Sequence, residues 1–167
     1  MAGLVTVAGR LVIGARGWDH PQWAGSFFPD DLPEDWRLTY YSNEFSGVLV
    51  PVSLWRVADA KSVRAWKEAV AEEFLFYLEF GTAEDYRHVE RTRQSLHPHF
   101  GGLVPPGPNI MHANEPWDLR KLGQRLTQLA GETGGAAEFA PGFFLAGYPP
   151  DIARLREVRL LTDLLML

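Results

Sequence analysis

The chain contains no cysteine, which excludes disulfide bonds, thiolate zinc sites and a cysteine nucleophile. No apolar run reaches the roughly 18 residues that a membrane-spanning helix needs. The N-terminus lacks a basic start followed by a long apolar stretch, so we expect no signal peptide. Positive charge is in the minority, since 16 Lys and Arg against 21 Asp and Glu leave a net charge of −5. This balance argues against a nucleic-acid-binding surface. We therefore expect a cytoplasmic protein that binds neither membranes nor nucleic acid.

What the chain does contain is ordinary for a globular domain. Its 167 residues fit one domain over 1–167, at roughly 150 residues per domain. Hydrophobic residues make up 46% and charged residues 22%, which rules out a disordered chain. Aromatic residues make up 13%, so we expect large rings to fill much of the core.

Short apolar segments alternate along the chain with amphipathic ones. This alternation is typical of α/β proteins, in which buried parallel strands are covered by helices on both faces. We expect strands near 11–15, 47–54, 74–80 and 100–104, with one or two more after 135. We expect helices near 34–44, 59–72, 83–96 and 117–130. On helical spacing, the predicted core includes Trp36, Val63, Trp66, Leu122 and Leu126, with Tyr86 and Leu119 also on inward faces.

The length limits how complete such a fold can be. A closed eight-unit TIM barrel needs about 250 residues, or roughly 31 per strand–helix unit. This chain therefore supplies five units and a fragment of a sixth. We predict parallel βα units in a partial or incomplete TIM-barrel-like fold.

The segment Ile13–Phe45 reads IGARGWDHPQWAGSFFPDDLPEDWRLTYYSNEF and resembles the opening of the domain of unknown function 72 family. The stretch from Val48 to Trp66 is similar to the family's next block. The resemblance implies a TIM-barrel-like fold with a pocket at the carboxyl ends of the strands, and it implies no particular reaction. On this basis the chain is a short, divergent, C-terminally incomplete member, similar to the N-terminal five to six units of the family barrel. The residues that match the opening block are Gly14, Gly17, Trp18, Trp23, Gly25, Phe27, Pro29, Trp36, Tyr40 and Tyr41.

The chain departs from the family pattern where the family carries polar residues at strand ends. Leu49 and Pro51 replace Glu and Asn, Glu79 replaces Lys, and Ala140-Pro141 replaces Arg-His. Unpaired polar groups at such positions cost on the order of 1–3 kcal/mol and persist only where they are used. We therefore interpret the chain as a degenerate, non-catalytic relative that keeps the scaffold and has an interaction or regulatory role.

An enzyme remains the main alternative. Asp19 beside His20 follows the first predicted strand and suits general acid–base chemistry, although His20 also fits a loop residue that caps the next turn. Glu79 and Glu138 would make a paired-carboxylate site of the hydrolase type, although Glu79 also fits a rim position facing water.

A small-ligand binder is the weaker alternative. Arg16, Trp18 and Trp55 are its candidate binding residues, and Phe76 would help line the pocket. An Arg near a strand end also commonly pairs with a neighbouring carboxylate, and that alternative stays open for Arg16.

Other motifs point to no cofactor and no metal. Gly14 and Gly17 lack the third glycine of a dinucleotide-binding loop. Four histidines, at 88, 97, 99 and 112, follow no recognised zinc spacing and have no cysteine beside them.

The C-terminal segment carries the most concentrated apolar sequence in the chain. Exposed to water, such a segment is an aggregation hazard, so something should cover it. Twofold pairing is the commonest homo-oligomer symmetry, so we expect a homodimer through this segment, with closure onto the chain's own sheet as the rival explanation. The residues concerned are Leu160, Leu161, Leu164, Leu165, Met166 and Leu167.

Overall fold

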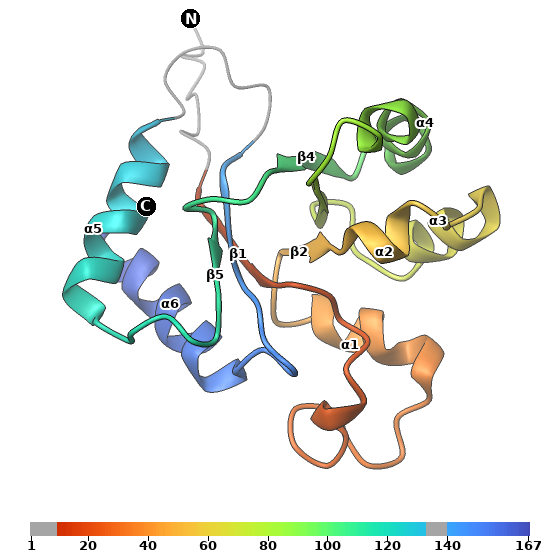
Figure 1. The fold of residues 1–167 in the computed structure, drawn as a ribbon. Coiled ribbons are helices and arrows are strands. Elements are labelled where there is room, and N and C mark those ends of the chain that lie inside the picture. Colours follow the sequence, from red (N-terminus) through yellow and green to blue (C-terminus); the bar gives the residue numbers. More distant parts are fainter. Residues whose placement is uncertain (1–9, 133–139) are drawn as a thin grey trace, which may run out of the picture.

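Parallel strands and helices alternate along residues 10–132 and 140–167, the part of the chain that the computed structural model describes (Figure 1). This arrangement confirms the predicted α/β class. The strands are β1 (Val12–Ala15), β2 (Gly47–Val50), β3 (Leu75–Glu79), β4 (Phe100–Val104), β5 (Ile110–Met111) and β6 (Gly142–Leu145). The helices are α1 (Arg37–Ser42), α2 (Val52–Trp55), α3 (Ala60–Glu68), α4 (Asp85–Leu96), α5 (Leu119–Gly131) and α6 (Ile152–Leu164), and short 3-10 turns occupy Pro21–Trp23 and Glu34–Trp36.

The strands pair in the order β5-β6-β1 and β2-β3-β4, and every pairing is parallel. A parallel bridge between Arg16 and Leu49 joins the two halves at β1 and β2. It is reinforced by a 2.8 Å hydrogen bond from the Gly17 N–H to the Leu49 carbonyl. The six strands therefore follow one another in a single series from β5 through β1 to β4.

This series must curve. A flat sheet of six strands places its two edge strands about 24 Å apart, at about 4.8 Å per strand. The link 105–109 connects the two edge strands β4 and β5, and a link of this length spans at most about 20–22 Å. The sheet therefore bends, and Val104 of β4 and Ile110 of β5 belong to the same buried cluster. No strand pairing joins them within the described residues, so the ring stays open at that point.

The gap in this sheet lies in a different place from the gap expected for a barrel that has only its N-terminal strands. Such a fragment would be open between its first and last strands. Here the last strand, β6, pairs with the first, β1, with Val12 opposite Gly142. The opening lies instead between β4 and β5, because residues 105–109 form a short link without a helix.

Each strand sends one buried side chain into a cluster on the concave side of the sheet. Tyr77 occupies its middle, with its ring centroid 5.0 Å from that of Phe144. The Tyr77 hydroxyl donates a 2.8 Å hydrogen bond to the Ala140 carbonyl, so its one polar atom is satisfied. A Cβ atom on Gly101 would lie 2.7 Å from the Tyr77 ring, which requires glycine there. The cluster consists of Val12, Leu49, Tyr77, Val104, Ile110 and Phe144.

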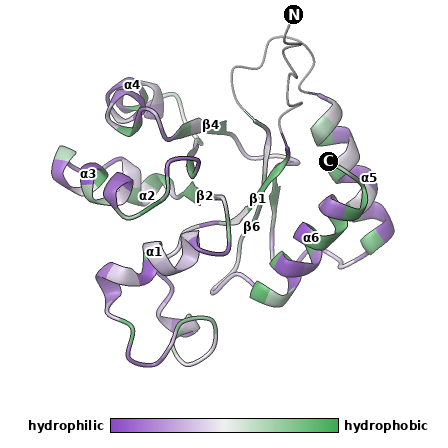
Figure 2. Ribbon diagram, turned by 180° about the vertical axis from the view of Figure 1, so that it is seen from behind, coloured by the Kyte–Doolittle hydropathy of each residue, from purple (hydrophilic) through white to green (hydrophobic). Residues whose placement is uncertain are grey.

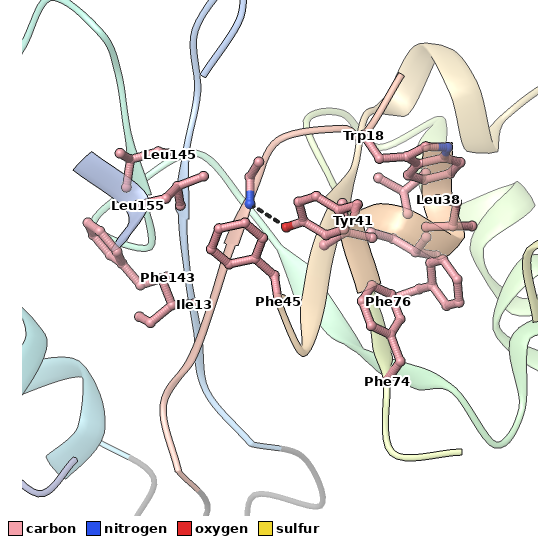
Figure 3. Close-up of a cluster of buried hydrophobic side chains, with 14 of the residues drawn as sticks. Ile13, Trp18, Leu38, Tyr41, Phe45, Phe74, Phe76, Phe143, Leu145 and Leu155 are labelled. Atoms are coloured by element: carbon pink, nitrogen blue, oxygen red, sulfur yellow. Dashed lines mark hydrogen bonds between the residues drawn. The ribbon is translucent and has the colours of Figure 1, made fainter. Parts of the chain in front are cut away.

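A larger core fills the space between the convex side of the sheet and the helices. Figure 3 shows aromatic rings from α1 and β3 packed together on one side of β1, and aliphatic and aromatic side chains of β6 and α6 on the other. The Tyr41 hydroxyl accepts a 2.8 Å hydrogen bond from the Ala15 N–H and donates one of 2.8 Å to the Gly47 carbonyl. Tyr41 thereby ties α1 to both β1 and β2.

The starts and buried faces of the helices follow from their local sequence. Asp59, Asp118 and Asp151 accept backbone hydrogen bonds at the starts of α3, α5 and α6, as N-cap residues do. Val63, Leu122 and Leu126 are buried as predicted, and Trp66 is half-buried against the core.

Other sequence predictions are wrong. The strand predicted for 47–54 ends at Val50, because Pro51 has no N–H for the ladder and starts the short helix α2. Trp36 is exposed because it lies at the very start of α1, where Arg37, Leu38 and Tyr41 face the core instead. Tyr86 and Leu119, each near the start of a helix, are exposed as well. The two-residue strand β5 gave no periodic signal in the sequence.

Candidate functional site at the carboxyl ends of the strands

Parallel strands bring their carboxyl ends together at one edge of the sheet, and ligand sites of α/β proteins lie there. In this chain Arg16 follows β1, and Glu79 is the last residue of β3. Their side chains meet across the end of β2 in a two-point ion pair. Arg16 Nε lies 2.5 Å from Glu79 Oε2, and Arg16 Nη2 lies 2.9 Å from Glu79 Oε1.

The α2 turn supplies further hydrogen bonds to Glu79. The Val52 N–H donates to Glu79 Oε1 at 3.3 Å, and the Trp55 indole N–H donates to the Glu79 backbone carbonyl at 2.8 Å. Both donors are available because α2 starts directly after Pro51 and therefore lies over the end of β3. Both carboxylate oxygens of Glu79 thus have protein partners.

Electrostatics favour the charged form of Arg16. The hydrogen bond to Glu79 raises the pKa of Arg16, against the opposing effect of burial, and the Tyr148 hydroxyl contributes in the same direction. The two side chains are 28% and 19% exposed, so solvent screens their attraction only in part. The site carries one positive and one negative charge in contact and hence no net charge.

Asp19 and His20 contact different partners. Asp19 Oδ1 lies 2.5 Å from Arg37 Nη1, whereas His20 Nε2 lies 3.0 Å from the Arg16 carbonyl. Burial lowers the pKa of His20, so its ring is neutral at pH 7. The His20 ring also packs edge-on against Trp23, with centroids 4.4 Å apart. Its contacts are those of a loop residue that stabilises the turn after β1.

The remaining candidates lie elsewhere. Trp18 and Trp55 are buried in the core between sheet and helices, so we assign both to packing. Glu138 lies outside the described residues, and its distance from Glu79 is not defined. Within the described residues, no three His, Asp or Glu side chains come together as metal ligands. His99, for example, is buried and bonded through Nδ1 to the Phe74 carbonyl.

A pocket of about 260 Å³ lies at the same edge of the sheet, beside the ends of β5 and β6. Met111 and Leu145 form part of its wall, and His112, Trp117 and Arg154 contribute polar or aromatic groups. Sequence reasoning did not predict this pocket. Its only signal is Pro149-Pro150-Asp151, which marks the start of α6 and thereby the position of Arg154.

A curved, open parallel sheet with helices on its convex face and polar groups at its strand ends defines an α/β protein of barrel-like design. A family model described as "Protein of unknown function DUF72" matches residues 12–138, and the chain belongs to this family. The crystal structure of a DUF72 family protein from Thermotoga maritima is similar, with a TM-score of 0.56 and 10% sequence identity. That match covers 92% of this chain and 99% of the Thermotoga chain. No curated protein matches the sequence.

The described helices are all too short or too polar to cross a lipid bilayer. The cytoplasmic location stays a prediction.

Proposed function

We propose that this chain is a non-catalytic member of its family whose role is to interact with another protein. The observation that carries the proposal is the state of Glu79. Arg16 and the Val52 N–H occupy both of its carboxylate oxygens, at 2.5–3.3 Å. A role for Glu79 in general acid–base catalysis would require a substrate to compete with these three N–H donors for its oxygens.

The enzyme alternative lacks an assembled catalytic group in the described residues. Asp19 pairs with Arg37 and does not orient His20, and the positive charge that Arg16 would offer an anionic substrate is already neutralised. The charged pair at the strand ends instead fastens β1, β3 and α2 to one another. This is a structural role.

A second copy of the chain is the partner that we propose first. The end of α6 exposes Leu160, Leu164, Leu165 and Met166, and hydrophobic colour marks this end beside α5 in Figure 2. An apolar groove of about 630 Å³ runs between α5 and α6 and continues this surface. Leu161 and Leu167 turn inward and pack against the core, so the segment partly covers itself and still leaves an apolar face in water.

The catalytic question is tested with Glu79→Gln and the matched control Glu72→Gln, an exposed residue outside the helices and strands. Purified wild-type protein and both variants are assayed with p-nitrophenyl esters, phosphates and glycosides. We expect no turnover above buffer in any of them. Turnover that Glu79→Gln abolishes and Glu72→Gln preserves would establish the hydrolase alternative.

The partner is tested by light scattering coupled to gel filtration at micromolar concentration. We expect twice the mass of the 18.8 kDa chain for the wild type, and the monomer mass for Leu164→Glu. A stable dimer buries more than about 1,000 Å² in total. A wild-type protein that stays monomeric on concentrating would refute the homodimer and favour a different protein partner.

A further inference from the structure

We propose that the pocket beside β5 and β6 binds a small monocarboxylate with an apolar body, which Arg154 holds by its carboxylate. The proposal is independent of the non-catalytic role argued above, since the pocket shares none of its lining residues with the Arg16–Glu79 pair.

Arg154 is held in a defined position. Its guanidinium carbon lies over the Trp117 ring, 4.8 Å from the ring centroid, within cation–π distance. Its Nε lies 3.8 Å from Asp151 Oδ2, on the N-cap residue of its own helix. Trp117 is itself fixed, because its indole N–H donates a 3.1 Å hydrogen bond to Glu157. An arginine fixed in this way loses little further freedom when it binds an anion.

The terminal nitrogens of Arg154 have no acceptor among the described residues. Other arginines differ in this respect. Arg125 donates to two backbone carbonyls and to Glu115, and Arg156 makes a two-point contact with Glu44. Arg154 alone in this comparison combines a fixed guanidinium with free donors, and it does so at the edge of a pocket. Two parallel N–H groups match the two oxygens of a carboxylate.

The apolar walls and the size of the pocket indicate what is attached to the carboxylate. Met111, Leu145 and Pro149 line the pocket with apolar surface. The volume of about 260 Å³ lies below the roughly 300–1,000 Å³ of sites for drug-sized molecules, so the ligand must be small. A carboxylate attached to one ring or to a short branched chain places its charge at Arg154 and its body against these walls.

Charge alone does not make this pocket a strong anion site. The carboxylate of Asp151 lines the same pocket and lies close to Arg154, so it offsets part of the attraction that Arg154 exerts on any anion. Tight binding therefore needs the apolar body of the ligand as well as its carboxylate. Besides Arg154, two residues of the lining carry side-chain N–H groups, His112 at the end of β5 and Trp117. The Trp117 N–H is already bonded to Glu157, so the His112 imidazole is the second donor that a ligand can use.

The test uses benzoate as the probe and benzyl alcohol as its uncharged analogue, with saturation-transfer and chemical-shift NMR on the full chain. We expect saturable millimolar binding of benzoate, at least tenfold weaker in Arg154→Gln and unchanged in Arg64→Gln, which removes an exposed charge from α3. Benzyl alcohol should bind at least tenfold more weakly than benzoate to the wild type. A melting curve for each variant confirms that it is folded.

A second measurement does not depend on a variant. Intermolecular NOEs should connect the benzoate ring to the Met111 methyl group and to the Trp117 indole in the wild-type protein. The proposal fails if benzoate binds Arg154→Gln as well as the wild type, or if it does not bind below 20 mM. It also fails if inorganic phosphate binds more tightly than benzoate, because phosphate has no apolar body and the apolar walls would then contribute nothing to binding.

Discussion

Replacing Glu79 with Gln removes one charge from the pair at the carboxyl ends of β1 and β3 and leaves Arg16 facing a neutral amide. Replacing Arg16 with Met leaves the Glu79 carboxylate with the Val52 N–H as its remaining contact. The two single variants and the double variant together form a cycle that measures how strongly the two charges are coupled.

The magnitude follows from the exposure of the pair. Fully exposed pairs contribute about 0.2–1 kcal/mol, and breaking a fully buried pair costs about 3–5 kcal/mol. Arg16 and Glu79 are 28% and 19% exposed and bond at two points, which places each single variant near 2 kcal/mol of lost stability. The double variant should also lose about 2 kcal/mol rather than 4, which gives a coupling of about 2 kcal/mol.

Urea denaturation followed by circular dichroism measures these free energies. For a chain of this size, the expected loss also lowers the melting temperature of each single variant by about 4–8 °C. Glu72→Gln serves as the control and should leave stability within about 0.5 kcal/mol of the wild type. Additive single losses, with a coupling below about 0.5 kcal/mol, would contradict the structural role that we assign to the pair.

Three further predictions concern the core, the glycines and pH. Leu126→Ala should cost about 2–5 kcal/mol because the side chain is fully buried, and Leu119→Ala should cost less than about 1 kcal/mol, as equilibrium unfolding will show. Gly101→Ala should cost about 1–3 kcal/mol because its Cβ meets an aromatic ring, whereas Gly131→Ala, with open space around it, should be neutral or slightly stabilising in thermal melts. Burial lowers the pKa of His20, so the unfolded chain takes up a proton at a higher pH than the folded one, and stability should fall as the pH drops below about 6.5. His20→Gln should reduce this fall between pH 7.5 and 5, and an identical pH dependence in the variant would count against the buried, neutral ring.

Local sequence patterns predicted most of the elements for a simple reason. The i, i+3, i+7 spacing of Leu119, Leu122 and Leu126 defines a helix whatever it packs against, and the structure contains that helix as α5. The inward face is harder to predict at helix ends. Trp36 and Tyr86 fit the spacing, yet both are exposed at the starts of α1 and α4, where the neighbouring Arg37 and Asp85 are buried instead.

The candidate site was only partly predictable. The sequence identified Arg16 and Glu79 as strand-end residues, and it left open whether Arg16 pairs with a carboxylate. The two residues are 63 positions apart, and they meet because β1 and β3 flank the same strand. Asp19 and His20 show the opposite case, since these sequence neighbours have different partners.

The sequence by itself determined the α/β class, the family and the positions of most helices and strands, because periodicity and short motifs are properties of local segments. Only the tertiary structure decided which strand ends lie together, where the curved sheet stays open and that Arg154 points free donors into a pocket. Those features depend on the order of the strands and on side chains far apart in the chain. Arg154 and Trp117 acquire their arrangement in this way, because the folding of α6 beside the end of β5 brings the Arg154 guanidinium over the Trp117 indole.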